Sequence, residues 1–180
     1  MADALRVAGL RELFTPHQIS LRIQELAKEI DALYGEERFV AICVLKGAFI
    51  FCSDLVRCVR NKNVEVDFVR LCSYGSGSAS SGQIVISKDV DIPLSGKHVL
   101  IVEDIVDSGR SMHFLLERLA MRNVRSLRLA ALIDKRERRE VAVHVDFAAF
   151  HVDRGFVVGY GLDYAERWRS LPAVCEIIAE

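Results

Sequence analysis

Acidic and small residues follow an apolar run in the middle of the chain. Residues 99–102 are all apolar, which predicts a strand buried on both faces. Three carboxylates and three small residues come directly afterwards: Glu103, Asp104, Asp107, Ser108, Gly109 and Ser111. Apolar residues then recur at helical spacing, so a helix should start near Arg110. We therefore expect a strand, an acidic turn, a small-residue loop and a helix start at the carboxyl edge of a parallel sheet, where α/β proteins bind ligands.

Each part of this arrangement suits a particular chemical group. Backbone N–H groups of residues 108–111, leading into a helix N-terminus, suit a phosphate dianion. The adjacent carboxylates of Glu103 and Asp104 suit sugar hydroxyls or a hydrated divalent cation. A phosphate site beside a diol site predicts a ribose 5-phosphate ligand. Two alternatives remain open on pattern alone: an acidic strand end that holds only Mg²⁺, and a solvated turn.

The segment Glu-Asp-Ile-Val-Asp-Ser-Gly-Arg-Ser at 103–111 resembles the phosphoribosyl-pyrophosphate signature of the type I phosphoribosyltransferases. The run Phe-Val-Val-Gly-Tyr-Gly-Leu-Asp-Tyr at 156–164 resembles the base-binding segment of the hypoxanthine-guanine branch. The resemblance extends from about residue 39 to the C-terminus. It implies an α/β fold with a central, mostly parallel sheet flanked by helices and a small hood. It also implies a single domain, with a core at about 36–155, a hood from about 1–15 and 156–180, and a mobile loop at about 73–83.

The resemblance implies a purine-salvage enzyme that uses Mg²⁺. Such an enzyme transfers the 5-phosphoribosyl group from phosphoribosyl pyrophosphate to hypoxanthine or guanine, giving IMP or GMP and pyrophosphate. The implied phosphoribosyl-pyrophosphate-binding residues are Lys46, Gly47, Glu103, Asp104, Asp107, Ser108, Gly109, Arg110, Ser111 and Arg169. The implied purine-binding residues are Lys135, Phe156, Val157 and Asp163, and the implied metal ligands are Glu103, Asp104 and Asp163.

Several of these residues are expected to have individual roles. Asp107 is best placed to act as general base near N7 of the purine. Lys135 would reach the exocyclic oxygen of the base, while Arg136 to Arg139 are expected to form a solvated charged turn. Ser73 and Tyr74 would begin a lid that excludes water. The resemblance also implies a cis peptide bond between Lys46 and Gly47.

Two glycines depart from the family pattern. Gly155 and Gly161 stand where bulkier residues are common, on either side of the base-binding segment. In the signature, Ser108, Arg110 and Ser111 replace the common Thr, Lys and Thr, and they preserve hydroxyls and charge.

The rest of the chain predicts the elements around the site. Thr15, Pro16 and Gln18 form a helix start with a capping box, an apolar stripe from Ile19 to Leu33 follows, and Gly35 ends the helix. A second helix is predicted over about 48–60. Strands are predicted over residues 39–45, 64–71, 83–88, 127–133, 143–150, 156–160 and 174–178.

Composition narrows the class of partner. The 180 residues carry a net charge of −1, which offers no general attraction to nucleic acid or membrane. The N-terminal residues show no signal-peptide pattern, so we expect a cytoplasmic protein. The five cysteines lack a C-x-x-C spacing and are expected to be small core residues. The resemblance implies a homodimer or a homotetramer.

Two functions from other classes are also considered. A regulator on the same fold could bind RNA or DNA and sense nucleotides, but the chain has no strong basic excess and no added DNA-binding domain. A phosphatase or phosphotransfer protein could use Glu103, Asp104 and Asp107 around Mg²⁺. That alternative leaves Lys135, Phe156 and Arg169 without roles.

Overall fold

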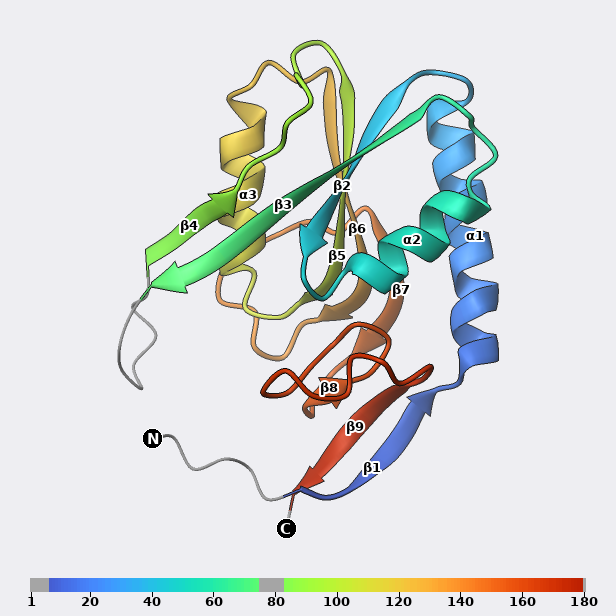
Figure 1. Ribbon diagram of the computed structural model, residues 1–180, viewed down its shortest axis with the longest axis vertical. Helices are drawn as coiled ribbons and strands as arrows, with labels where there is room; N and C mark the ends of the chain where they lie inside the picture. The colour runs from blue at the N-terminus through green and yellow to red at the C-terminus, as the bar shows by residue number, and fades with distance from the viewer. Residues whose placement is uncertain (1–6, 75–82, 180) are drawn as a thin grey trace.

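The computed structural model describes residues 7–74 and 83–179, and its centre is a six-stranded sheet (Figure 1). The strands run in the order β4-β3-β2-β5-β6-β7, and all neighbours are parallel except β4 and β3. The bounds are β2 Phe39–Leu45, β3 Val64–Tyr74, β4 Gln83–Lys88, β5 His98–Val106, β6 Ser126–Lys135 and β7 Phe147–Val152. The predicted α/β fold with a mostly parallel central sheet is confirmed.

Helices cover both faces of this sheet, and strand alternation supplies each face with its own core. The helices α1 (Pro16–Tyr34) and α2 (Phe49–Cys58) lie on one side, and α3 (Arg110–Ala120) lies on the other (Figure 1). Within β5, Leu100 and Val102 join the core under α1 and α2, whereas Val99 and Ile101 join the core under α3. Successive side chains of a strand point to opposite faces of the sheet. A central strand covered by helices on both sides, such as β5, therefore carries apolar side chains on both faces.

The start of α1 follows the sequence closely. Gln18 N donates to Thr15 Oγ1 at 3.2 Å and Thr15 N donates to Gln18 Oε1 at 2.9 Å, which confirms the capping box. The predicted apolar stripe is wrong only at its end. Leu33 is 48 % exposed, whereas Tyr34 is buried and stacks on Phe39. The last turn therefore faces the core through residue 34 and not through residue 33.

A second, three-stranded sheet joins the two ends of the chain at the carboxyl ends of the central strands (Figure 1). Its order is β1-β9-β8, with β1 Val7–Phe14, β8 Val157–Val158 and β9 Val174–Ala179. The sequence did not predict β1, whose partner β9 lies more than 150 residues away and leaves no local signal. The predicted strand at 156–160 shortens to two residues, because Gly159 has φ +94° and the chain turns there.

Two other strand predictions were wrong in their bounds. Glu103 and Asp104 lie inside β5 and not in a turn, since its pairing with β6 continues from Glu103 to Val106. The predicted strand at 143–150 begins only at Phe147. The earlier residues Val143 and Val145 are apolar because they pack against the core under α3. Of the cysteines expected in the core, Cys58 is exposed at the end of α2.

The carboxylate of Asp67 links β3 to the segment that follows β4. It accepts hydrogen bonds from the backbone N–H groups of Phe68, Asp91 and Ile92 at 2.7–2.8 Å, and its side chain is only 6 % exposed. Burial alone would raise the pKa of Asp67, but these three N–H donors and the charge of Lys88 outweigh it and lower the pKa. The carboxylate form is therefore stabilised by folding.

We expect Asp67→Asn to lower the free energy of unfolding by about 1–3 kcal/mol at pH 7, because a charged acceptor of three buried N–H groups is lost. The folded-state pKa lies below the unfolded value of about 3.9, so this contribution exists above that pH and disappears as the pH falls through the folded-state pKa. Urea unfolding of the parent and the variant at pH 7 and near pH 3 measures the loss of unfolding free energy at each pH. Asp91→Asn, which changes an 85 % exposed carboxylate nearby, is the matched control. An equal loss for both variants would contradict the role of Asp67.

Candidate active site

A cavity of about 150 Å³ opens where the central sheet meets the small sheet. The residues that line it come from β5, the end of β6 and the segment around β8: Asp104, Ile105, Asp107, Lys135, Gly155, Phe156, Val157, Leu162 and Asp163. Six of these nine residues were predicted as site residues from the sequence. The structure thus brings the acidic end of β5 and the C-terminal base-binding segment to one place.

The two carboxyls at the end of β5 share a constrained environment. Glu103 is 7 % exposed, and its Oε1 accepts a hydrogen bond from Asp104 N at 3.0 Å. Burial, and then the charge and side-chain hydrogen bond of Asp104, raise the pKa of Glu103 well above its usual value. Such a pair favours one shared proton or a bound cation over two free charges. Asp104 lines the cavity and Glu103 supports it from the interior.

Asp107 and Lys135 face each other across the cavity. Lys135 is 5 % exposed, donates through Nζ to the Gly155 carbonyl at 2.8 Å, and lies 3.9 Å from Asp107 Oδ1. That Oδ1 is buried and accepts no hydrogen bond within the described part of the chain. A buried carboxylate oxygen without a donor is unusual, and a ligand proton would satisfy it. The predicted base and the predicted purine-binding lysine therefore lie together.

The loop between β5 and α3 is held from the far side by a residue that the sequence analysis missed. Arg139 donates to the carbonyls of Val106 at 2.9 Å, Asp107 at 3.0 Å and Lys135 at 3.1 Å, and to Asp134 Oδ1 at 2.6 Å. Its side chain is 17 % exposed, so the predicted solvated turn is wrong at this position. No local signal separates Arg139 from Arg136 and Arg138, because the contacts that hold the loop are to Val106 and Asp107, more than 30 residues away in the sequence.

The predicted phosphate-binding loop has the geometry of an anion site. Gly109 is the N-cap of α3 with φ +84°, and a Cβ there would collide with the Val141 carbonyl. Because the cap is a glycine, no cap side chain covers the helix N-terminus. Ser108 and Ser111 flank it, while Arg110 pairs with Glu140 at 2.6 Å. Within the loop, Arg110 N makes a long hydrogen bond of 3.4 Å to Ser108 Oγ, which a phosphate oxygen could replace.

The loop after β2 is packed too tightly for any side chain at Gly47. A Cβ on Gly47 would collide with the carboxylate of Asp104, and a Cβ on Gly161 would collide with the Gly47 carbonyl. Gly155 is similarly close to the side chain of Glu176. The two glycines that depart from the family pattern thus stand where neighbouring atoms leave no space. The implied cis bond is wrong by one residue, since it joins Leu45 to Lys46.

Lys46 and Arg169 converge on one carboxylate. Lys46 Nζ lies 2.9 Å from Glu166 Oε1, and Arg169 NH2 lies 3.2 Å from Glu166 Oε2. The same guanidinium also pairs with Asp163 at 2.7 Å and donates to the Gly161 carbonyl at 2.8 Å. Lys46 and then Arg169 lower the pKa of Glu166. Two cations predicted to bind pyrophosphate are therefore close enough to share an anion.

The C-terminal segment offers both a ring face and a free strand edge. Phe156 is 40 % exposed, lines the cavity and meets Tyr164 edge-on with ring centroids 5.2 Å apart, so it is not a core residue. Ile177 N donates to the Phe156 carbonyl at 2.8 Å. Strand alternation then turns the N–H and carbonyl of Val157 away from β9. Both groups are available to the polar edge of a planar ligand.

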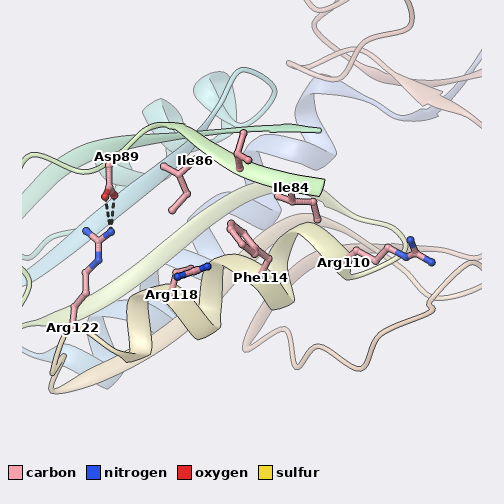
Figure 2. A pocket seen from close by; sticks show the side chains of 8 residues that line it. Ile84, Ile86, Asp89, Arg110, Phe114, Arg118 and Arg122 are labelled. Carbon is pink, nitrogen blue, oxygen red and sulfur yellow. Dashed lines mark hydrogen bonds and ion pairs between the residues drawn. The ribbon is translucent and has the colours of Figure 1, made fainter. Parts of the chain in front are cut away.

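The predicted lid lies largely outside the described residues. Ser73 and Tyr74 end β3, and the loop beyond them is not described. A larger hollow, of about 560 Å³, lies between α3 and β4 (Figure 2). There Phe114 points toward β4, and Arg122 is paired with Asp89 at 2.6 Å. None of the predicted purine-binding residues lines this hollow, so it is not the candidate active site.

Comparison with known proteins agrees with this geometry. Residues 10–165 match the model of the phosphoribosyl transferase domain family. The hypoxanthine-guanine phosphoribosyltransferase of Aquifex aeolicus is 44 % identical over 171 residues, covering 94 % of this chain and 96 % of its own. The Bacillus subtilis enzyme of the same name is 40 % identical, covering 90 % of this chain and 89 % of its own.

A solved structure of a hypoxanthine-guanine phosphoribosyltransferase from Bacillus anthracis superposes with a TM-score of 0.88 at 36 % identity. The match covers 96 % of this chain and all of that one. The family model, the relatives and the structure each cover most of the chain. The protein therefore belongs to the phosphoribosyltransferase family, in its hypoxanthine-guanine branch.

Proposed function

We propose that this protein transfers the 5-phosphoribosyl group from phosphoribosyl pyrophosphate to hypoxanthine or guanine, giving IMP or GMP and pyrophosphate. One observation carries the proposal: Asp107, Lys135 and Phe156 line one cavity together with the acidic end of β5. A phosphatase site would leave the exposed Phe156 ring beside Asp107 and Lys135 without a role. Membership of the hypoxanthine-guanine branch supports the same reaction.

In this proposal the purine lies against the ring of Phe156. The backbone of Val157 reads its polar edge, and Lys135 donates to its exocyclic oxygen. Asp163 lies near the substituent at position 2. Asp107 Oδ1, which accepts no hydrogen bond from the described residues, accepts the proton at N7 while another ring nitrogen attacks C1 of the ribose. Positive charge develops on the ribose ring as the bond to pyrophosphate breaks.

The phosphoribosyl group lies between β5 and α3. Backbone N–H groups of residues 108–111 hold its 5-phosphate, and Glu103 and Asp104 hold the ribose hydroxyls. The negative charge of these carboxyls favours the cationic transition state. Lys46, Gly47 and Arg169 bind the departing pyrophosphate. A lid that begins at Ser73 and Tyr74 would keep water from the reacting carbon.

The carboxyls at the end of β5 suit Mg²⁺. Within residues 7–74 and 83–179, no three His, Cys, Asp or Glu side chains form a complete metal cage. Mg²⁺ commonly takes one or two carboxylates and completes its shell with water and substrate phosphates. Burial and then the charge of Asp104 raise the pKa of Glu103, and a bound divalent cation would relieve the repulsion between the two carboxyls. Glu103 and Asp104 would hold one ion and Asp163 a second. Mg²⁺ neutralises charge on the leaving pyrophosphate when bound.

The remaining proposals concern assembly and location. One similar structure addresses how the C-terminal region affects the oligomeric state and activity of the Trypanosoma cruzi hypoxanthine phosphoribosyltransferase, at 37 % identity and a TM-score of 0.87. We propose a homodimer or a homotetramer for this chain, in one domain with the small sheet as its hood. No helix in the described part of the chain is long and apolar enough to cross a membrane. The cytoplasmic location stays a prediction of the sequence.

The reaction is tested directly by turnover of hypoxanthine, guanine and xanthine with phosphoribosyl pyrophosphate and Mg²⁺. We expect nucleotide formation from hypoxanthine or guanine, followed by ultraviolet absorbance, and its loss when EDTA removes the metal. The panel also ranks the three bases. Absence of turnover with both hypoxanthine and guanine would exclude the proposal.

Asp107→Asn tests the general base. We expect turnover to fall at least about tenfold, since proton transfer by a positioned side chain contributes roughly 10²–10⁴-fold. Binding of phosphoribosyl pyrophosphate and the unfolding transition should change little, because Asp107 Oδ1 accepts no hydrogen bond within the described residues and its ion-pair contacts with Lys135 and Arg138 are long, at 3.9 and 3.8 Å. Undiminished turnover would remove Asp107 from the mechanism.

Phe156→Leu tests the ring face for the purine. Loss of an aromatic face costs about 0.5–1.5 kcal/mol, so we expect the KM for hypoxanthine to rise about 2–10-fold with little change in kcat. Phe68→Leu is the matched control, because Phe68 is also 40 % exposed but lies on β3 outside the cavity. Steady-state kinetics with varied hypoxanthine concentration gives KM and kcat for each variant. Equal KM values for both variants would place the purine elsewhere.

A further inference from the structure

One carboxylate occupies the point where the two proposed pyrophosphate-binding cations meet. Glu166 uses one oxygen for Lys46 at 2.9 Å and the other for Arg169 at 3.2 Å. Lys46 follows β2, whereas Glu166 and Arg169 belong to the segment after β8. The carboxylate therefore bridges two segments that are far apart in the sequence.

The backbone around Glu166 is fixed in an uncommon conformation. Ala165 and Glu166 have φ of +51° and +62°, in the left-handed region that non-glycine residues rarely adopt. Glu166 N donates to Asp163 Oδ2 at 2.8 Å, which anchors this turn to the cavity wall. Left-handed residues in succession persist only where the surrounding structure enforces them. The turn thus directs the Glu166 carboxylate toward the two cations.

A bound diphosphate and the Glu166 carboxylate would compete for the same donors. To bind phosphate oxygens, Lys46 would give up or share its contact with Glu166, and Arg169 would share the donor that it now divides between Glu166 and Asp163. The contact is suited to exchange, because the Lys46 and Glu166 side chains are 48 % and 64 % exposed. Exposed ion pairs of this kind are weak and readily replaced by water or another anion.

We propose that Glu166 is an internal anion that occupies the pyrophosphate position in the ligand-free protein and is displaced when a diphosphate binds. This inference rests on the proposed function, since it takes Lys46 and Arg169 as the pyrophosphate-binding cations. Without a bound diphosphate, Lys46 and Arg169 both pair with the Glu166 carboxylate. When pyrophosphate is the product, Glu166 competes for its donors and promotes release. Glu166 is thus a positioning residue that sets the affinity for the leaving group.

The test is the affinity of the full-length protein for pyrophosphate in the presence of Mg²⁺, measured by isothermal titration calorimetry. Glu166→Gln retains the size of the side chain and removes its charge. We expect it to bind pyrophosphate at least about threefold more tightly, because the competing anion is gone. Affinity for IMP should stay within twofold of the parent value. A purely structural role for Glu166 would not tighten the binding of one ligand selectively.

Glu25→Gln is the matched control, because Glu25 is 60 % exposed and pairs with Arg22 at 2.9 Å on α1. It changes the net charge equally, and we expect it to leave the affinity for pyrophosphate unchanged. Unchanged or weaker affinity in Glu166→Gln, or equal tightening in both variants, would overturn the inference.

Lys46→Met separates this inference from the proposed function. If Lys46→Met weakens pyrophosphate binding and Glu166→Gln fails to tighten it, only the inference about Glu166 is wrong. If Lys46→Met has no effect, the proposed pyrophosphate position is itself wrong, and the inference falls with it. In the double variant we expect the gain from Glu166→Gln to shrink, because the carboxylate no longer competes for Lys46.

Discussion

The close packing of Gly47 between Asp104 and Gly161 is the contact on which the site depends. Gly47 follows β2, Asp104 lies near the end of β5, and Gly161 follows β8. Three segments that are separate in the sequence are therefore in direct contact here. A methyl group at Gly161 would collide with the Gly47 backbone carbonyl and force the two segments apart, and one at Gly47 would displace the Asp104 carboxylate. Because protein interiors are close-packed, such a shift would also move the neighbouring groups of the site.

This packing places charged groups in a small volume, and most of them have a hydrogen-bond partner within the described residues. Lys135 donates to the Gly155 carbonyl, Glu103 accepts from Asp104 N, and Arg169 pairs with Asp163 and Glu166. These contacts offset part of the cost of burying charge, although the neighbouring Glu103 and Asp104 carboxyls still repel each other. The exception is Asp107 Oδ1, which is buried and lacks a donor in the described residues. The least satisfied atom of the cavity is thus the one proposed to accept the proton.

The loop that carries Asp107 owes its shape to residues distant in sequence. Arg139 binds the backbone carbonyls of Val106 and Asp107, and Glu140 and Val141 donate their N–H groups to the Ser108 carbonyl at 2.9 and 3.1 Å. A turn of high charge is therefore a scaffold for the neighbouring loop. Its arginines differ in role. Arg139 is mostly buried and binds the loop backbone, whereas Arg138 is 68 % exposed and reaches only the Asp107 side chain, and Arg136 is 73 % exposed.

The sequence by itself determined the fold class and most of the cavity. Apolar runs at residues 39–45, 99–102 and 127–133 predicted buried strands, and these are the parallel strands β2, β5 and β6. The residues after the run at 99–102 were expected at the carboxyl edge of the sheet, and Asp104 and Asp107 line the cavity there. These signals are local: a run of apolar side chains, a capping box or a glycine next to a helix start can be read within a few residues.

The tertiary structure decided what depends on distant partners. It paired β1 with β9, extended β5 through Glu103 and Asp104, distinguished Arg139 from its neighbours, and brought Glu166 between Lys46 and Arg169. Each of these depends on contacts between segments far apart in the chain, which no pattern within one segment encodes.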